Sequence, residues 1–159
     1  MKSIIITILS VLFIHDTNAQ DQWKNIYRES AWVERDQWQR AGELIRLLKI
    51  KQGSQVADIG CHEGYMTTKL SPAVGPSGKV LAVDVDQSKL NLLKDHLEDR
   101  KIGNVTLVKG DYDNPKLPVN TIDAVLILDA YHEMDDHDKI LQHIKVALKQ
   151  GGRLLLCEP

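Results

Sequence analysis

The sequence predicts an α/β domain in which a doubly wound parallel sheet carries helices on both faces. Short apolar runs of strand length alternate along the chain with segments of helical periodicity, which is the pattern of repeated β-α-β units. These runs are apolar almost throughout, as expected for strands that are covered on both faces. Glycines and acidic residues directly follow several of the runs, at the sheet edge where such folds bind ligands.

Length and composition fit one globular domain. The chain has 159 residues, of which 43% are apolar and 26% charged, and this is enough for a core of its own. The net charge of −2 gives no basic footprint, so nucleic acid is not expected as a partner. Cys61 is expected in a loop and Cys157 in a strand, so we expect two free thiols and no disulfide.

The first 19 residues have the order of a secretory signal peptide. Lys2 is followed by an apolar run over 4–14 and by a short polar stretch that ends at Ala19. The apolar run is too short to span a bilayer, which takes about 20 residues. The alternative is an uncleaved amphipathic or buried helix. We therefore expect an exported protein, periplasmic or secreted, if the signal is real, and a cytoplasmic protein otherwise.

The elements of the first half follow from local patterns. Apolar residues recur at helical spacing over 36–48, which predicts the first helix. The apolar run over 55–59 is the first strand. A short helix over 64–70 follows and is expected to stop at Ser71-Pro72, because proline interrupts helical hydrogen bonding. We accordingly divide the chain into the signal over 1–19, an N-terminal helical segment over 20–53 and the main domain over 54–159.

The rest of the chain repeats the same alternation. Its helical segments carry leucine or isoleucine on one face, and its strands are short apolar runs. Gly151-Gly152 is expected to end the last helix. The predicted elements are strands over 79–85, 104–109, 122–128 and 153–157, and helices over 87–100 and 137–148.

Polar residues and glycines stand at the carboxyl ends of the first four strands. In parallel sheets these ends meet at one edge, near the switch in strand order where ligands bind. The residues concerned are Asp58 with Gly60, His62 and Gly64, then Asp84, then Gly110-Asp111, and last Asp129 followed by Tyr131-His132-Glu133.

Five motifs in this order carry a family resemblance. VADIGCHEG, AVDVD, KGDYDNPKLP, IDAVLILDAYHEM and LKQGGRLLLCEP resemble those of class I S-adenosylmethionine-dependent methyltransferases, which have a Rossmann-like domain. The resemblance runs from about Trp32 to Pro159. The family implies seven strands, whereas the sequence supplies five, so the last two are expected to be missing and the domain to be C-terminally truncated. The fifth strand is then an open edge through which copies can associate.

The resemblance also implies roles for the strand-end residues. Two carboxylate oxygens suit the two hydroxyls of a ribose, and glycines let backbone approach a ligand closely. A histidine stands where the family has its middle glycine. The implied donor contacts are Asp58 at the amino group, Gly60, His62 and Gly64 along the methionine and ribose, Asp84 at the ribose, Asp111 at the adenine amine, Val85 and Tyr112 beside the ring, and Asp129 near the transferring methyl group.

Two further groups are interpreted with alternatives left open. His132 and Glu133 stand where a general base or an acceptor contact is expected. Trp32, Arg35 and Gln39 precede the first motif, and they either help close over the donor or form ordinary surface. The acceptor is a small molecule or a protein side chain that the sequence does not identify.

Other functions are weighed against methyl transfer. A noncatalytic, degenerate Rossmann-like binding module is the main alternative. An NAD-dependent oxidoreductase is disfavoured because the G-x-G-x-x-G loop is absent. No metal site is expected, because a zinc-binding HExxH motif needs histidine where the chain has Asp136.

Overall fold

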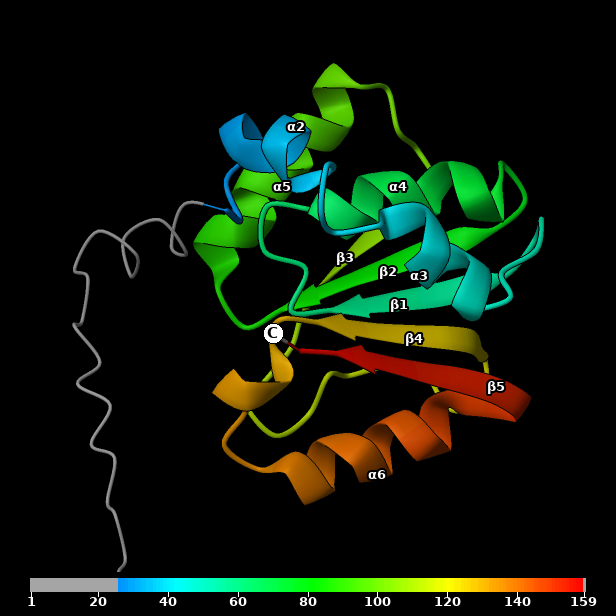
Figure 1. Cartoon of the computed structure of the whole chain (residues 1–159). Coiled ribbons are helices and arrows are strands. Elements are labelled where there is room, and N and C mark those ends of the chain that lie inside the picture. Colours follow the sequence, from blue (N-terminus) through cyan, green and yellow to red (C-terminus); the bar gives the residue numbers. More distant parts are fainter. Residues whose placement is uncertain (1–25, 159) are drawn as a thin grey trace, which may run out of the picture.

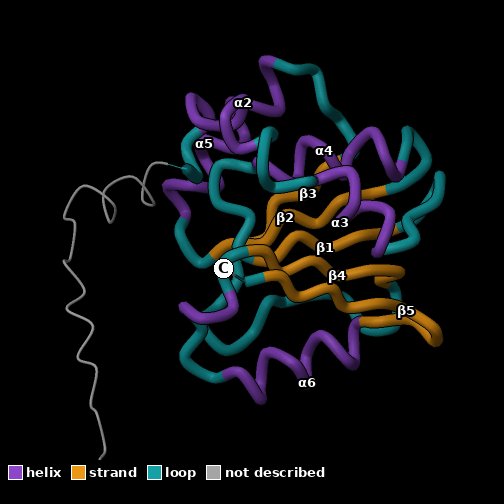
Figure 2. The backbone as a smooth tube through the Cα atoms, in the orientation of Figure 1, coloured by secondary structure: helices purple, strands orange, loops and turns teal. Residues whose placement is uncertain are grey.

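The computed structural model describes residues 26–158, so the proposed signal over 1–19 lies outside the described residues. It confirms the predicted α/β fold: a five-stranded, wholly parallel sheet with strand order β3-β2-β1-β4-β5 (Figures 1 and 2). The strands are β1 (Gln55–Ile59), β2 (Lys79–Asp84), β3 (Val105–Lys109), β4 (Ile122–Leu128) and β5 (Leu148–Cys157).

Helices cover both faces of the sheet. They are α2 (Trp32–Arg35), α3 (Ala41–Leu47), α4 (Tyr65–Val74), α5 (Gln87–Asp99) and α6 (His137–Ala147), with single 3₁₀ turns at η1 (Glu29–Ala31) and η2 (Tyr131–Glu133). Figure 1 shows α6 on one face of the sheet and α3, α4 and α5 on the other.

The core is built from alternate residues of each strand. Val56 of β1 packs with buried residues of α4 and with the end of α3, while its neighbour Ala57 packs with residues of α6. Ala82 of β2 lies among the buried leucines of α5. Because both faces of the sheet are covered, the strand residues that point to either face are apolar. This is why each strand is a continuous apolar run in the sequence.

Several predicted elements differ from the structure in their bounds. The helix expected over 36–48 begins only at Ala41: α2 ends at Arg35, and a left-handed backbone at Arg40 (φ 53°) separates the intervening turn from α3. The helix α4 does not stop at Ser71-Pro72 but continues to Val74, whose fully buried side chain anchors the last turn.

The glycine pair does not end α6. The helix ends at Ala147, and Gly151-Gly152 lies within β5, which begins at Leu148. A register shift between β4 and β5 accommodates the extra residues, and Gly151 there has a φ of 79°. Glycine tolerates such a bulge because it has no side chain to clash.

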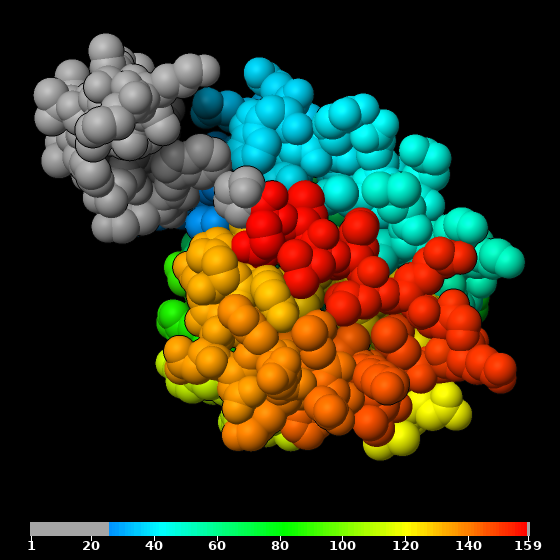
Figure 3. Space-filling view, turned by 60° about the horizontal axis from the view of Figure 1, so that its bottom comes forward, coloured from blue at the N-terminus to red at the C-terminus, as the bar shows by residue number. Residues whose placement is uncertain are grey.

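Three further features concern the last strand, the cysteines and the character of the helices. Figure 3 shows β5, in red, running along the surface next to α6. Both cysteines are free, Cys61 buried and Cys157 half-buried. Over residues 26–158, no helix combines the length and the apolar character that crossing a bilayer requires.

Candidate functional site

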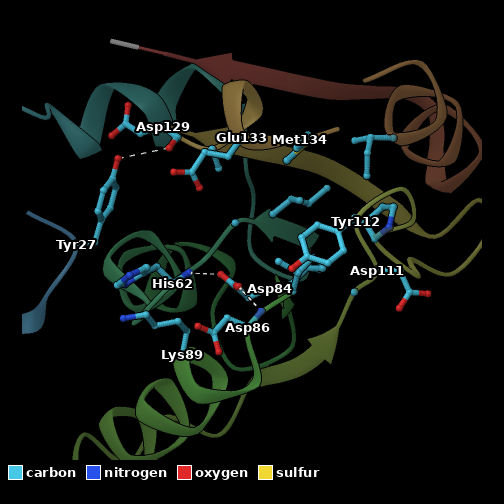
Figure 4. A pocket seen from close by; sticks show the side chains of 18 residues that line it. Tyr27, His62, Asp84, Asp86, Lys89, Asp111, Tyr112, Asp129, Glu133 and Met134 are labelled. Atoms are coloured by element: carbon cyan, nitrogen blue, oxygen red, sulfur yellow. Dashed lines mark hydrogen bonds between the residues drawn. The ribbon is translucent and has the colours of Figure 1, made fainter. Parts of the chain in front are cut away.

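A cavity of about 410 Å³ opens at the carboxyl ends of β1, β2, β3 and β4 (Figure 4). This volume lies in the range of small-molecule sites, roughly 300–1,000 Å³. Eight residues predicted from the sequence line it: Gly60, His62, Asp84, Val85, Asp111, Tyr112, Asp129 and Glu133. The predicted residues Asp58, Gly64 and His132 do not.

The loop from β1 to α4 depends on two glycines with positive φ. A Cβ on Gly60 (φ 75°) would lie 2.4 Å from the Cβ of Ala130, so the two loops meet closely there. Gly64 (φ 95°) begins α4, and a Cβ on it would strike Leu93 of α5 at 2.2 Å. Gly60 therefore shapes the cavity wall, whereas Gly64 seats the loop on α5.

His62 keeps the loop conformation that a glycine would adopt most easily. Its φ is 49°, a region in which histidine is one of the better-tolerated residues. Its backbone N–H donates to Oδ2 of Asp84 at 2.8 Å, and the Asp86 N–H donates to Oδ1 of the same carboxylate, also at 2.8 Å. The ends of β1 and β2 are thus joined through Asp84, and each of its oxygens keeps a lone pair for a ligand.

The imidazole of His62 lines the cavity beside Tyr27. The ring centroids are 5.3 Å apart, and the buried Nδ1 has no hydrogen-bond partner within residues 26–158. Burial, assisted by the positive charge of Lys89, lowers the pKa of His62, so the ring is neutral at pH 7. A buried polar atom without a partner is costly, and the ring has to turn before this nitrogen can reach a ligand.

Asp58 lies beneath the loop instead of in the main cavity. It borders a small neighbouring cavity of about 20 Å³ together with Arg35 and Tyr65. Its Oδ2 accepts the Thr67 hydroxyl at 2.6 Å. Burial raises the pKa of Asp58 to about 6, although the Thr67 hydrogen bond and the charge of Arg35 act in the opposite direction.

Asp129 forms a buried ion pair with Arg35. The Nη2–Oδ2 distance is 2.7 Å, and the residues are 3% (Arg35) and 9% (Asp129) exposed. Gln39 accepts the Nε–H of Arg35 at 3.0 Å, and the guanidinium lies over the ring of Tyr65, 4.3 Å from its centroid. Arg35 and Gln39 are therefore not ordinary surface, and the segment before β1 is tied to the end of β4.

The other strand-end residues are more exposed. Asp111 pairs with Lys116 at 2.9 Å, and the side chain of Tyr112 is 67% exposed at the cavity rim. Glu133 lines the cavity from η2 (Figure 4). The imidazole of His132 points elsewhere, into contact with the carboxylate of Glu158.

Several lining or supporting residues have no motif that singles them out. Tyr27 lines the cavity and donates its hydroxyl to the Asp129 carbonyl at 3.5 Å. Lys89 lines it from α5, and Glu158 follows β5 within the quoted LKQGGRLLLCEP motif.

Asp136 caps α6 by accepting the Lys139 N–H at 3.1 Å, and the described part of the chain contains no group of three residues suited to a metal ion.

The lining of the cavity is strongly acidic. Its charged residues are one ammonium, from Lys89, and five carboxylates, from Asp84, Asp86, Asp111, Asp129 and Glu133. Apolar wall comes from Ile59, Val83, Val85, Ala130, Met134 and Ile140. Such a lining suits a ligand with an apolar ring, hydroxyl groups and positive charge, and it opposes a pyrophosphate.

Comparison with known proteins identifies the family to which the chain belongs. A family described as "Methyltransferase domain" matches residues 56–152. The chain is 36% identical over 115 residues to the ubiquinone/menaquinone biosynthesis C-methyltransferase UbiE of Saccharophagus degradans, covering 72% of this chain and 46% of that protein. The corresponding protein of Pseudomonas entomophila is 34% identical over 122 residues, covering 76% and 47%. The chain thus spans about half the length of these relatives.

A solved structure extends the similarity to the fold. The crystal structure of a SAM-dependent methyltransferase from Aquifex aeolicus superposes with a TM-score of 0.76 at 26% identity, covering 86% of this chain and 70% of that one. The matched residues include the strand ends that form the cavity. The chain belongs to the class I S-adenosylmethionine-dependent methyltransferase family.

Proposed function

We propose that the chain binds S-adenosylmethionine in the 410 Å³ cavity and transfers its methyl group to an acceptor. The acidic lining carries this proposal. Two of its five carboxylates pair with cations, Asp111 with Lys116 and Asp129 with Arg35, and the other three, against one ammonium, still favour a cationic ligand over an anionic nucleotide. The bound donor supplies an electrophilic methyl group. The protein's part is to hold it in line with the acceptor and to exclude water.

The residues present fit such a donor. The free lone pairs of Asp84 would accept the ribose hydroxyls, and His62 lines the same cavity. Val85 and Tyr112 would lie against the adenine, with Asp111 near its amine. The buried Asp58–Arg35–Asp129 group would hold the zwitterionic amino-acid end from below the loop.

For the acceptor we propose a hydroxylated aromatic ring that is methylated at carbon. The similar proteins of Saccharophagus degradans and Pseudomonas entomophila are ubiquinone/menaquinone biosynthesis C-methyltransferases, and this supports the acceptor class. Apolar wall from Met134, Ala130 and Ile140 near Glu133 offers a surface against which a flat ring can pack. A protein side chain remains the alternative acceptor to be tested beside it.

Calorimetric titration of the full chain with S-adenosylmethionine, S-adenosylhomocysteine and NAD tests donor binding. We expect saturable binding of the first two, no binding of NAD, and at least a tenfold loss of affinity in Asp84→Ala. Asp95→Ala, on the exposed face of α5, is the matched control and should bind as wild type does. Absence of donor binding by a sample with a cooperative thermal transition would refute the proposal.

Turnover separates an enzyme from a noncatalytic binding module. Donor-saturated protein is mixed with 1,4-dihydroxynaphthalene under reducing conditions, and S-adenosylhomocysteine and methylated ring are quantified by mass spectrometry. One product of each per turnover supports methyl transfer to this acceptor class. Tight donor binding without product from the ring or from protein extracts would favour the noncatalytic module.

Two further expectations concern assembly and location. We propose that copies associate along β5, since it is the last strand of the described sheet and exposes 38% of Leu154 and 39% of Leu156. Sedimentation of wild type against Leu156→Lys tests this, and monomers at all concentrations would refute it. The cytoplasmic source of the proposed donor favours a cytoplasmic location over export, and fractionation of cells that express the tagged full chain decides between them.

A further inference from the structure

The carboxylate of Glu158 reaches from the end of β5 to the turn that follows β4. Its Oε1 accepts the backbone N–H of Tyr131 at 2.9 Å, and its Oε2 accepts that of His132 at 3.4 Å. The Nδ1 atom of the His132 imidazole contacts the same Oε2. β4 and β5 are parallel neighbours, so their carboxyl ends lie together and one side chain can join the two loops.

This contact fixes both the orientation and the tautomer of His132. A carboxylate only accepts hydrogen bonds, so the imidazole proton belongs on Nδ1 and the lone pair on Nε2. A carboxylate that orients a histidine in this way is a recurrent means of presenting Nε2 as a base. Within residues 26–158, no hydrogen bond engages Nε2, and half of the side chain, 52%, is exposed.

The His132 imidazole is half exposed to solvent, and the residue lies on the turn that carries part of the cavity wall. Ala130 and Glu133, which flank it in the chain, both line the cavity, while His132 itself does not. With the donor in the cavity, an acceptor has to approach from outside. A base for the acceptor therefore belongs at the rim and not in the donor pocket.

The charges around His132 all favour its protonated form. Glu158 from the end of β5 contributes most, through its hydrogen bond, and Glu133 from the same turn and Asp129 from the end of β4 add to it. Together they raise the pKa of His132. The pKa of Glu158 is lowered: partial burial acts to raise it, but the bonds from His132 and from the Tyr131 N–H outweigh this effect.

Resting on the methyltransferase function proposed above, we propose that His132 is the general base for the acceptor and that Glu158 is the positioning residue that holds its Nε2 toward the acceptor. For a hydroxylated aromatic acceptor, the O–H bond breaks and its proton passes to Nε2. The ring carbon forms a bond to the methyl carbon while the C–S bond breaks, and its electron pair stays on sulfur. The ring carbon then loses its hydrogen as a proton to solvent, which restores aromaticity, and the proton on Nε2 returns to the phenolate oxygen.

The first test follows His132 itself, without any acceptor. In the ¹⁵N-labelled full chain, two-bond ¹H–¹⁵N correlations report which nitrogen carries the proton. We expect the Nδ1–H tautomer in wild type, and in Glu158→Gln a mixture of tautomers with a titration midpoint moved to lower pH. His143→Gln, on the exposed face of α6, is the control and should change neither. An unchanged midpoint and tautomer in Glu158→Gln would overturn the pairing.

The second test measures turnover of 1,4-dihydroxynaphthalene as a function of pH. We expect kcat to fall about 10- to 100-fold in Glu158→Gln, as for loss of a group that orients a catalytic histidine, with little change in KM or in donor affinity. The acid limb of the kcat profile should move to lower pH together with the NMR midpoint. A profile and kcat equal to those of wild type would overturn the proposed role of Glu158.

His132→Gln is the second variant, for the case that Glu158→Gln does not fold, because it keeps the hydrogen bond from the Tyr131 N–H to Glu158. It should bind donor as wild type does. Its kcat profile against pH should lack the acid limb, and most of the turnover should be lost. Full turnover in this variant would refute the base. Failure of wild type to bind donor would instead refute the proposed function, while the NMR result would still decide whether Glu158 and His132 are paired.

Discussion

Replacing Arg35 by methionine tests whether the buried charges before β1 and after β4 form one unit. The guanidinium contacts Asp129 at 2.7 Å, and its charge also lowers the pKa of Asp58. Methionine preserves much of the side-chain volume but leaves both carboxyl groups without their cation. Removing one partner of a buried pair costs about 3–5 kcal/mol, because the other charge stays desolvated.

Urea unfolding at pH 7 measures this loss. With an m value of about 2 kcal/mol/M, the midpoint should fall by roughly 1.5–2.5 M, a large part of a typical stability of about 5–15 kcal/mol. Arg46→Met, at an exposed position of α3, is the control and should change stability by less than about 0.5 kcal/mol.

The loss should also depend on pH. Without Arg35, the pKa values of Asp58 and Asp129 rise further, so the folded variant takes up protons that the unfolded chain does not. Stability then falls as pH rises through this window, and the deficit relative to wild type is largest near pH 7 and smaller at pH 5. A shift of the urea midpoint of less than about 0.5 M would refute the reasoning. A shift of the same size at pH 5 and at pH 7 would refute it as well.

Two other predictions follow from the same region. Burial raises the pKa of Asp58 to about 6 from 3.8, so the folded state binds the extra proton between these values and wild-type stability falls as pH rises through them. Asp58→Asn should remove this dependence, so its free energy of unfolding, measured by urea titration, should rise by up to about 3 kcal/mol relative to wild type between pH 4 and pH 7. Stability curves of the two proteins that run parallel over this pH range would contradict the prediction. Gly60→Ala places a Cβ 2.4 Å from that of Ala130 at a φ of 75°, so we expect it to cost about 1–3 kcal/mol and at least tenfold in donor affinity by calorimetry. Wild-type affinity in this variant would mean that the loop adjusts freely.

The strands and the edge that carries the site were readable from local patterns. Runs such as 55–59 and 122–128 are continuously apolar because both faces of the sheet are covered, and this property is independent of how the strands are ordered. Acids and glycines after these runs then had to gather at one edge, because all strands are parallel. Helix bounds were less readable, since Val74 holds α4 beyond a proline through tertiary burial.

Side-chain direction was not readable, because it depends on which neighbour fills the space. Asp58 and Gly64 belong to the same motif as Gly60, yet Asp58 turns below the loop to Thr67 and Gly64 packs on Leu93. Neither lines the main cavity, although both stabilise the loop that does.

The sequence by itself determined the fold class, the family and the edge at which the cavity forms, because these depend on residue type and order along the chain. Only the tertiary structure decided which distant groups meet: Arg35 with Asp129 across 94 residues, and Glu158 with His132 across 26. Such pairs form between the ends of different elements, and their partners are set by strand order and helix packing rather than by sequence spacing.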